Sequence, residues 1–259
     1  MTELRNQVVL VTGASSGIGA ACARAFAAAG SRLLIVARRS DRLKTLGREL
    51  TRLGAADLLV ASLDVRRADD VRRWADELPA TWKAIEVMVN NAGLSRGLDA
   101  LHEGSLEDWN EMIDTNVKGL LHVDRAVVPL MVQRGRGTVV HIGSIAGRQV
   151  YPGGNVYCAT KYAVRALTDG LRIDLLGSGV RVTSIDPGMV ETEFSEVRFH
   201  GDRDRAAAVY RGMTPLAAAD IADVVVFAAS RPPHVTLADA LVLPTDQASA
   251  TRVQRRKGS

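Results

Sequence analysis

The chain has 259 residues, and its 33 lysine and arginine residues against 29 acidic residues give it a net charge of +4. Because the basic residues are dispersed rather than gathered on one face, we expect no nucleic-acid partner. The sequence contains no apolar run of about 18 residues and no export signal at its start, so it predicts a protein that neither spans a membrane nor is secreted. Its two cysteines, Cys22 and Cys158, are expected to be reduced thiols, which favours the cytoplasm.

Apolar runs alternate with helical patterns along the chain. In chain order we expect strand Val8–Val11, helix Ile18–Ala29, strand Leu33–Ala37, helix Arg42–Leu53, strand Leu58–Ser62, helix Ala68–Leu78, strand Ile85–Asn90, helix Trp109–Gln133, strand Thr138–Ile142, helix Val156–Leu176, strand Arg181–Ile185, helix Ala219–Ala229 and strand Ala240–Leu243. The strands are apolar without a break, as in strands that are covered on both faces. The pattern predicts an α/β fold: one Rossmann-type domain over residues 1–259, with a doubly wound parallel sheet of seven strands and helices on both faces. A basic tail, residues 251–259, follows the last strand.

A glycine-rich turn joins the first predicted strand to the first helix. Its spacing, G-x-x-x-G-x-G, is one residue longer than the usual dinucleotide fingerprint. Glycines let the backbone approach a pyrophosphate closely, and the helix N-terminus offers free N–H groups and a positive dipole end. The alternative is a tight connection without a ligand. The predicted phosphate-binding residues are Gly13, Ser15, Ser16, Gly17, Ile18 and Gly19.

A serine, a tyrosine and a lysine form the second informative pattern. Ser144 ends an apolar run, and Tyr157 and Lys161 follow it four residues apart. At this spacing the tyrosine and the lysine lie on the same face of a helix. A nearby cation favours the phenolate, so Lys161 could lower the pKa of Tyr157 from about 10 and let it exchange a proton near neutral pH. Taken alone, the pair could equally be an exposed tyrosine and a solvated lysine.

The two patterns meet at one edge of the predicted sheet. In parallel sheets, ligands bind outside the carboxyl ends of the strands. Residues that follow six of the strands are Gly13, Arg38, Asp64, Asn91, Ser144 and the pair Pro187–Gly188. We therefore expect a single site along this edge.

Taken together, these motifs resemble the short-chain dehydrogenase/reductase family, and they occur in its order over nearly the whole chain. The matching segments are Thr12-Gly13-Ala14-Ser15-Ser16-Gly17-Ile18-Gly19, Asp64-Val65, Asn90-Asn91-Ala92-Gly93, Asp114-Thr115-Asn116-Val117, Ser144, Tyr157 with Lys161, and Asp186-Pro187-Gly188. The resemblance implies that Tyr157 is the acid/base and that Lys161 lowers its pKa. It further implies that Ser144 holds the substrate oxygen and that Asn116 anchors a water joining Lys161 to solvent.

The resemblance also implies a nicotinamide cofactor, a homotetramer built on the helices that carry Asn116 and Tyr157, and no metal ion. The cofactor contacts that it implies, beyond the glycine-rich turn, are Asp64 and Val65 at the adenine, Asn91, Ala92 and Gly93 beside the adenosine and ribose, Tyr157 and Lys161 at the nicotinamide ribose, and Pro187, Gly188, Val190 and Thr192 at the nicotinamide amide.

The end of the second strand indicates which nicotinamide cofactor is used. An NAD site needs an acidic residue there, to accept hydrogen bonds from the ribose 2′-hydroxyl. The sequence has Arg38 and Arg39 instead, and two guanidinium groups suit a 2′-phosphate. The alternative is a pair of solvated arginines. We expect NADP(H).

Residues 190–214 form the expected substrate lid. This segment and the C-terminal part of the chain resemble the NADP-dependent 3-hydroxy acid (serine-type) dehydrogenases, which oxidise the C3 alcohol of a small molecule that carries a free carboxylate. Arg148 and Arg198 are the candidates for binding that carboxylate, although either could be a surface arginine. The small-molecule substrate is therefore expected to be a hydroxy acid such as serine or 3-hydroxypropionate.

Two other functions compete with this interpretation. A carbonyl or 3-oxoacyl reductase acting on bulkier ketones would have an apolar lid without a partner for a carboxylate. A regulator or scaffold that binds the dinucleotide without catalysis is expected to lack Tyr157 or Lys161, and both are present.

Overall fold

The computed structural model describes residues 3–256. In chain order its elements are β1 (Val8–Thr12), α1 (Gly17–Ala28), β2 (Arg32–Ala37), α2 (Ser40–Leu53), β3 (Asp57–Ser62), α3 (Ala68–Asp76), β4 (Ile85–Asn90), α4 (Leu106–Ile113), the π-helix η1 (Asp114–Lys118), α5 (Gly119–Arg134), β5 (Gly137–Ile142), the 3₁₀ turn η2 (Ile145–Gly147), α6 (Asn155–Asp174), β6 (Val180–Pro187), β7 (Val190–Glu191), α7 (Phe194–Arg198), α8 (Arg203–Ala208), β8 (Leu216–Ala217), α9 (Ala218–Ala229) and β9 (Asp239–Val242).

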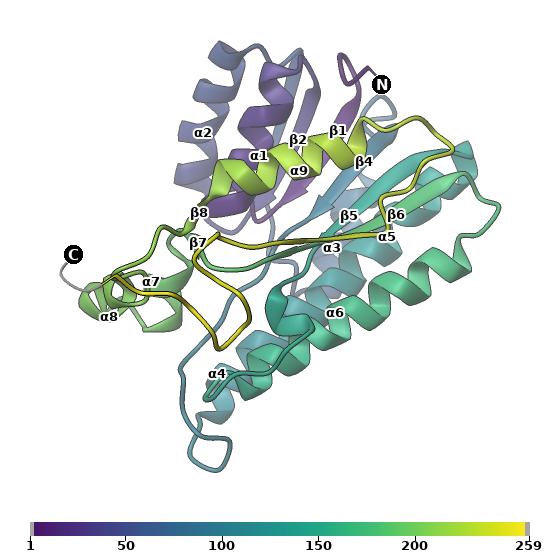
Figure 1. The fold of residues 1–259 in the computed structure, drawn as a ribbon. Helices are drawn as coiled ribbons and strands as arrows, with labels where there is room; N and C mark the ends of the chain where they lie inside the picture. Colours follow the sequence, from purple (N-terminus) through teal and green to yellow (C-terminus); the bar gives the residue numbers. More distant parts are fainter. Residues whose placement is uncertain (1–2, 257–259) are drawn as a thin grey trace.

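Seven of the strands form one parallel sheet in the order β3-β2-β1-β4-β5-β6-β9 (Figure 1). The order reverses between β1 and β4, and the crevice beside such a reversal is where doubly wound sheets bind ligands. The predicted fold class, a Rossmann-type doubly wound sheet of seven strands, is confirmed.

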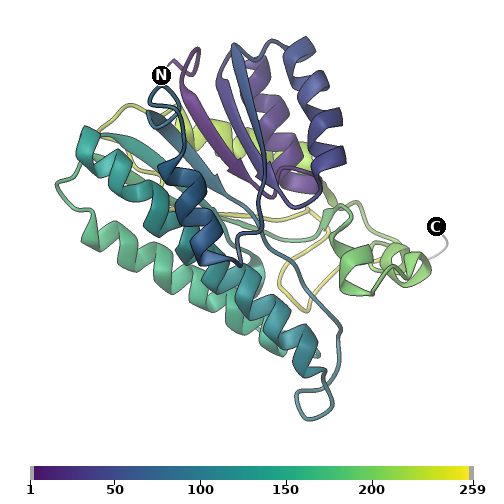
Figure 2. The same ribbon diagram turned by 180° about the vertical axis from the view of Figure 1, so that it is seen from behind.

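Alternate residues of the strands face two separate hydrophobic cores. Val9 and Val11 of β1 belong to the core under α1, α2 and α9, whereas Val8 and Leu10 belong to the core under α3 and α5. Figures 1 and 2 show these helical layers on opposite faces of the sheet. The continuous apolar character of the strands therefore has the predicted cause, burial on both sides.

One predicted helix is wrong in its internal structure. Residues 109–133 were expected to form one regular helix, but the segment begins earlier, at Leu106, and contains the π-helix Asp114–Lys118 between α4 and α5. A π-turn adds one residue to a helical turn, a small change that the hydrophobic period does not reveal. Such turns are frequent at functional sites, and this one contains Asn116. The other predicted elements have boundaries within a few residues of those observed.

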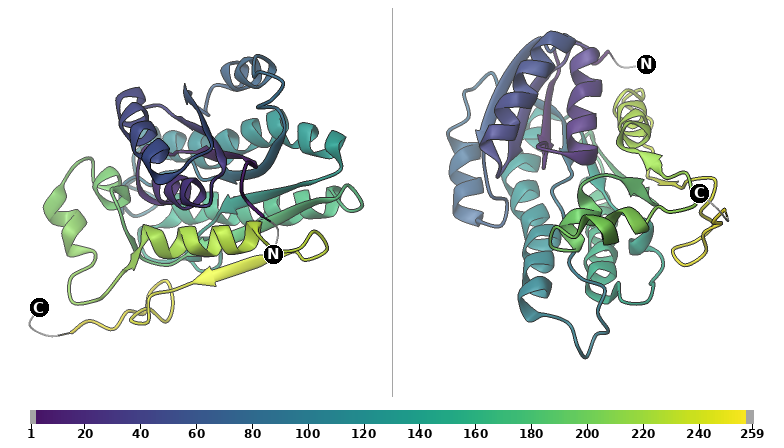
Figure 3. Two further views of the ribbon diagram at one scale, coloured as in Figure 1. Left: turned by 90° about the horizontal axis from the view of Figure 1, so that it is seen from above. Right: turned by 90° about the vertical axis from the view of Figure 1, so that its left-hand side faces the viewer.

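The segment between β7 and β8 stands apart from the helical layers. Its helices α7 and α8 lie at one end of the molecule, close to the C-terminal residues (Figure 3). The backbone N–H of Arg256 donates to the carbonyl of Gly212, and Arg255 donates to the carbonyls of Val209 and Arg211. The part of the basic tail within residues 251–256 is thus attached to this segment, and residues 257–259 lie outside the described residues.

Over residues 3–256, no helix is long and apolar enough to cross a membrane. The same residues contain no cluster of three or more His, Cys, Asp or Glu side chains that could hold a metal ion.

Candidate active site

A cavity of about 1110 Å³ follows the carboxyl edge of the sheet. This volume slightly exceeds the usual size of ligand pockets, roughly 300–1,000 Å³. Most of the predicted site residues line it. These are Gly13, Ser15, Ser16, Gly17, Ile18, Arg38, Arg39, Asp64, Val65, Asn91, Ala92, Gly93, Ser144, Tyr157, Lys161, Pro187, Gly188, Val190, Thr192 and Arg198. Gly19, Asn116 and Arg148 lie outside the lining.

The glycine-rich turn is held close to the end of β4. Gly13 has a φ of +64°, and a Cβ atom there would lie 2.8 Å from Nδ2 of Asn91 and 2.9 Å from Cα of Ala92. Gly19 packs behind the turn, because a Cβ atom on it would lie 2.5 Å from the carbonyl oxygen of Gly13. At the start of α1, Ser16 makes no side-chain hydrogen bond to the helix. The first N–H groups of α1 therefore remain available to a phosphate.

Asn91 joins the ends of β1 and β4. Its Nδ2 donates to the carbonyl of Thr12 at 2.9 Å, and its backbone N–H donates to Oγ1 of Thr12 at 2.9 Å. The hydroxyl of Thr115, buried and without a hydrogen-bond partner among the described residues, also lines the cavity. A buried polar group of this kind is a candidate for hydrogen bonding to a ligand.

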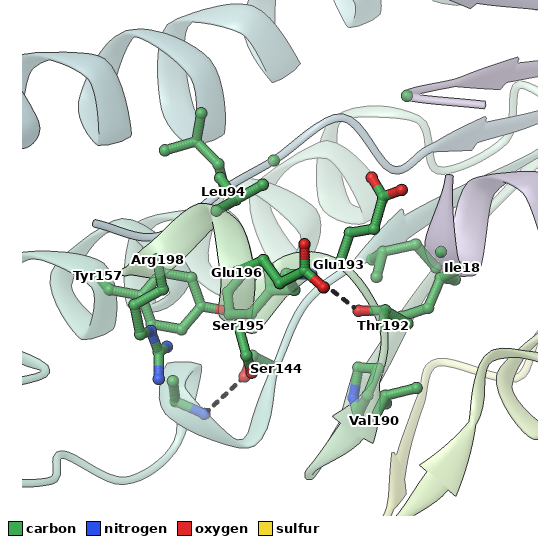
Figure 4. Close-up of a pocket in the computed structure, with 18 of the residues that line it drawn as sticks. Ile18, Leu94, Ser144, Tyr157, Val190, Thr192, Glu193, Ser195, Glu196 and Arg198 are labelled. Atoms are coloured by element: carbon green, nitrogen blue, oxygen red, sulfur yellow. Dashed lines mark hydrogen bonds between the residues drawn. The ribbon is translucent and has the colours of Figure 1, made fainter. Parts of the chain in front are cut away.

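Ser144, Tyr157 and Lys161 come together at the other end of the cavity. Ser144 follows β5, and its Oγ accepts a hydrogen bond from the backbone N–H of Ala146 at 3.0 Å. Tyr157 and Lys161 lie on α6, where both are 7% exposed. The Nζ atom of Lys161 donates to the carbonyl of Ile142 at 2.8 Å. Figure 4 shows Ser144 and Tyr157 at the same end of the pocket as Arg198.

Asn116 supports this group from behind. Its side chain accepts from the backbone N–H of Leu94 and donates to the carbonyl of Leu94, both at 2.8 Å, and it donates to Oγ1 of Thr160 at 3.0 Å. Gly93 lies close to both Asn116 and Lys161. A Cβ atom on Gly93 would lie 3.2 Å from Oδ1 of Asn116 and 3.7 Å from Nζ of Lys161. The π-turn brings Asn116 to this position.

Burial dominates the electrostatics of the tyrosine and the lysine. Burial raises the pKa of Tyr157, the neighbouring Tyr151 raises it further, and the charge of Arg198 and a hydrogen bond with Ser144 lower it. Burial lowers the pKa of Lys161 to about 8, against the opposite effect of Asp186. The predicted lowering of the tyrosine pKa by Lys161 does not appear in this structure, where burial of the phenol dominates the shift and the cation that lowers the pKa is Arg198.

Arg198 of α7 places a cation above the tyrosine. Its guanidinium lies 5.4 Å from the ring centre of Tyr157 and 5.1 Å from that of Phe194. Its Nε donates to Oγ of Ser95 at 3.1 Å, and its Nη2 donates to the hydroxyl of Tyr151 at 2.9 Å. The lid arginine is therefore fixed in direction inside the cavity.

Arg148, the other arginine predicted to bind a carboxylate, has different partners. Its Nε donates to Asp186 at 2.7 Å, and its Nη2 also pairs with Asp239. Asp186 is only 2% exposed, so the guanidinium neutralises a buried carboxylate rather than facing the cavity.

The arginines after β2 lie at the glycine-rich end. Arg39 donates from Nε and Nη2 to Oγ of Ser15, at 3.2 and 3.0 Å. Arg38 is 3.7 Å from the carboxylate of Glu111. Two further charged residues, Arg42 and Glu193, line this end and are paired with each other.

The cavity lining also contains residues that were not predicted as site residues, among them Arg42, Thr115, Tyr151 and Glu193. Arg42 could have been found, since it follows Arg38 and Arg39 closely at the start of α2. The other three carry no signal of their own in the sequence.

The sequence and the fold are similar to those of known dehydrogenases and reductases. A family model described as short chain dehydrogenase matches residues 7–202. An NADP-dependent 3-hydroxy acid dehydrogenase of Salmonella typhi is 46% identical over 244 residues, 94% of this chain and 97% of the relative. A protein of Chromohalobacter salexigens named sulfoacetaldehyde reductase 2 is 45% identical over 96% of this chain and 99% of its own length.

Among solved structures, the closed form of a serine dehydrogenase complexed with NADP⁺ is similar with a TM-score of 0.91 and 42% identity, over 97% of this chain and 100% of that one. The matched family model and the identities extend over most of the chain, and the TM-score shows that the fold is shared. The chain belongs to the short-chain dehydrogenase family.

Proposed function

We propose that this chain is an NADP-dependent dehydrogenase that transfers hydride between the cofactor and the C3 hydroxyl or carbonyl of a small hydroxy acid of the serine or 3-hydroxypropionate type. The observation that carries the proposal is the cation of Arg198, held 5.4 Å from the ring centre of Tyr157 within the cavity. A hydroxyl that reacts at Tyr157 would lie close to a site for a carboxylate.

The lining suits a dinucleotide. Gly13 and Gly17 have positive φ angles and no side chains, so a phosphate can approach the backbone N–H groups of the turn. The start of α1 offers further N–H groups, and the buried hydroxyl of Thr115 has no hydrogen-bond partner among the described residues. At the end of β2, Arg38 and Arg39 favour a 2′-phosphate over the free 2′-hydroxyl of NAD. These features support NADP(H) as the cofactor, with the contacts that the sequence predicts.

The bound nicotinamide would supply or accept the hydride, and the side chains at this end would manage the proton. Tyr157 exchanges a proton with the substrate oxygen, and Ser144 holds that oxygen by a hydrogen bond. Burial lowers the pKa of Lys161 to about 8. In its protonated form, Lys161 can stabilise the phenolate of Tyr157 by its positive charge. Asn116 does not contact the substrate in this proposal. Its side chain holds the backbone of Leu94 next to Lys161 by two hydrogen bonds.

Arg198 would bind the substrate carboxylate. A carboxylate that leaves water for the cavity must meet a fixed donor, because it loses hydration there. Arg198 is fixed by Ser95 and Tyr151, so it is oriented before substrate arrives. The pairing of Arg148 with Asp186 makes that arginine unsuitable, and the proposal uses Arg198 alone.

Formation of NADPH at 340 nm tests the function directly. The panel should contain serine, 3-hydroxypropionate, a neutral alcohol of the same size and, in the reverse direction, bulky neutral ketones and a small sulfonated aldehyde. We expect the highest kcat/KM with 3-hydroxy acids and NADP⁺. Preference for bulky ketones would favour the carbonyl or 3-oxoacyl reductase alternative, and preference for NAD⁺ would contradict the cofactor assignment.

Residues 190–214 act as the substrate lid in this proposal, because they contain Arg198 and lie against the tail residues that also line the cavity.

For the assembly we propose a homotetramer built on α5 and α6. These helices expose large apolar side chains, among them Leu121 at 41%, Tyr162 at 42% and Ile173 at 74%. Light scattering should give about four times the chain mass of 27.7 kDa. A mass of one chain would contradict the tetramer.

We also propose that the protein works in the cytoplasm. Cys22 and Cys158 are both buried and unpaired, as expected for a reducing compartment. Cell fractionation with a periplasmic marker tests this, and recovery with the marker would contradict it.

A further inference from the structure

Glu193 spans the cofactor cleft. It belongs to the lid, directly after Thr192, while Arg39 and Arg42 lie at the start of α2 on the opposite wall. One carboxylate oxygen accepts from Nη1 of Arg39 at 3.0 Å, and the other accepts from Nη1 of Arg42. In Figure 4, Glu193 lies beside Ile18 and Thr192, away from Tyr157 and Ser144. The contact therefore closes the end of the cleft opposite the catalytic residues.

Arg39 uses different nitrogens for its two neighbours. Its Nε and Nη2 face the hydroxyls of Ser15 and Ser16, on the side of the glycine-rich turn. Its Nη1 alone contacts Glu193. A guanidinium presents donors in a rigid planar fork, so it can serve two acceptors at once. A 2′-phosphate beside Ser15 and Ser16 could thus bind Arg39 without displacing Glu193.

The charges at this end favour simultaneous binding. Arg38, Arg39 and Arg42 bring three positive charges, against two negative charges from Glu193 and from Glu111, the partner of Arg38. A phosphate monoester carries about −1.5 to −2 at neutral pH. The cluster therefore keeps a net positive charge for the phosphate while Glu193 is in place.

The lid is also attached at a second point, independently of Glu193. Arg96 pairs with Glu111 at 2.8 Å and donates to the carbonyl of Val197 at 2.5 Å. The backbone N–H of Gly97 donates to the carbonyl of Arg198 at 2.9 Å. Loss of the Glu193 contact would therefore free one corner of the lid while the Arg198 end stays in place.

We propose that Glu193 is a positioning residue that clasps the lid to Arg39 and Arg42 across the bound dinucleotide, and that opening of this clasp sets the rate of cofactor release. The proposal rests on the proposed use of NADP(H). The three side chains of the clasp are 37–43% exposed, so the ion pairs are weak enough to open in each catalytic cycle.

The test is the release rate of NADPH, followed by stopped-flow fluorescence after displacement with excess NADP⁺. Glu193→Gln keeps the shape of the side chain and removes its charge. An exposed ion pair contributes up to about 1 kcal/mol, so we expect release to become about fivefold faster. The proposal requires the clasp to close over the bound dinucleotide, so the association rate should change by less than about twofold.

Glu196→Gln is the matched control. Glu196 belongs to the same lid and lines the same cavity, but its partner is the exposed Arg203, at 3.8 Å. Its substitution should leave the release rate unchanged. Arg42→Met should accelerate release like Glu193→Gln, and the double variant should be no faster than the more affected single variant, because the two side chains act through one contact.

The outcomes separate this proposal from the proposed function. If the parent protein does not bind NADPH, the proposed function fails, and the clasp fails with it. If the parent binds NADPH but Glu193→Gln releases it at the parental rate, or more slowly, the clasp is wrong while the proposed function stands. Equal acceleration by Glu196→Gln would also overturn the clasp, because it would indicate a general effect of lid charge.

Discussion

At the catalytic end of the cleft the important side chains are buried and bonded to backbone groups, whereas at the phosphate end they are exposed and paired with one another by charge. Lys161 and Asn116 are 7% and 2% exposed, and both hydrogen-bond to main-chain atoms. The side chains of Arg39, Arg42 and Glu193 are 37–43% exposed.

This difference has a physical consequence. Buried groups held by the backbone take their positions when the chain folds, and they cannot move without loss of hydrogen bonds. Exposed ion pairs contribute little free energy and can exchange partners. We therefore expect substitutions at the catalytic end to change turnover and stability, and substitutions at the phosphate end to change the binding and release of the cofactor.

The largest expected effect is that of Tyr157→Phe. Removal of the hydroxyl eliminates the proton path, so kcat should fall by about 10²–10⁴-fold. The dissociation constant for NADPH, measured by fluorescence titration, should stay within about twofold, because the phosphate end is untouched. Turnover within a few-fold of the parent would show that the buried end does not carry the chemistry.

Replacement of Arg38 and Arg39 together by alanine should have the next largest effect. Charge-assisted hydrogen bonds to a phosphate contribute roughly 1.5–3 kcal/mol, so kcat/KM with NADP⁺ should fall by roughly 10–150-fold. With NAD⁺, which lacks the 2′-phosphate, kcat/KM should fall by no more than about fivefold, the effect expected from loss of the Arg39–Glu193 contact. An equal loss with both cofactors would mean that the arginines support the fold rather than the phosphate.

Arg198→Met should reduce kcat/KM for 3-hydroxy acids by at least about tenfold, because the carboxylate loses its partner while the stem of the side chain is kept. A neutral alcohol of the same size should react at nearly the parental rate. Arg203→Met, in the exposed part of the same lid, is the control, and a comparable loss there would refute a specific role for Arg198.

Arg148→Met tests whether Arg148 stabilises the fold, in contrast to the substrate-binding role proposed for Arg198. It leaves Asp186 buried without its partner, so the free energy of unfolding should fall by about 1–3 kcal/mol in a urea titration. The ratio of kcat/KM between hydroxy acid and neutral alcohol should stay the same. A changed ratio would indicate that Arg148 contributes to binding of the substrate carboxylate.

Lys161→Met should raise stability at neutral pH although it removes activity. The folded-state pKa of about 8 lies below the ordinary value of 10.5, so folding has to overcome the cost of the buried ammonium at all pH values below 8. That cost disappears as the pH rises from 8 to 10.5. The variant should therefore exceed the parent in unfolding free energy by on the order of 1–3 kcal/mol at pH 7.

This gain should shrink when the same urea titrations are repeated above pH 9. A variant that is less stable than the parent at pH 7 would show that the hydrogen bond to Ile142 outweighs the desolvation of the lysine.

Local patterns in the sequence predicted the fold, and most of the site residues that they indicated line the cavity. The apolar strands identified the doubly wound sheet, because burial on both faces leaves few polar positions. The spacing of Gly13, Gly17 and Gly19 and the four-residue interval between Tyr157 and Lys161 express geometry within one turn or one helix. Parallel strands bring such segments to the same edge, so their convergence followed from the fold class.

Asn116 shows where local reasoning reached its limit. The sequence identified the residue by resemblance but gave no sign of the π-turn that carries it, since one extra residue per turn hardly disturbs the hydrophobic pattern. The bonds from Asn116 to Leu94 and Thr160 depend on that turn.

Only the tertiary structure decided the partners of the long charged side chains. Arg148 and Arg198 looked equivalent in the sequence, yet Arg148 pairs with Asp186, 38 residues away, and Arg198 lies over Tyr157. Glu193 meets Arg39 across 154 residues of chain. Hydrophobic periodicity encodes which backbone segments are buried, whereas an ion pair depends on which distant side chains the folded backbone brings within a few ångströms, and neither residue carries that information alone.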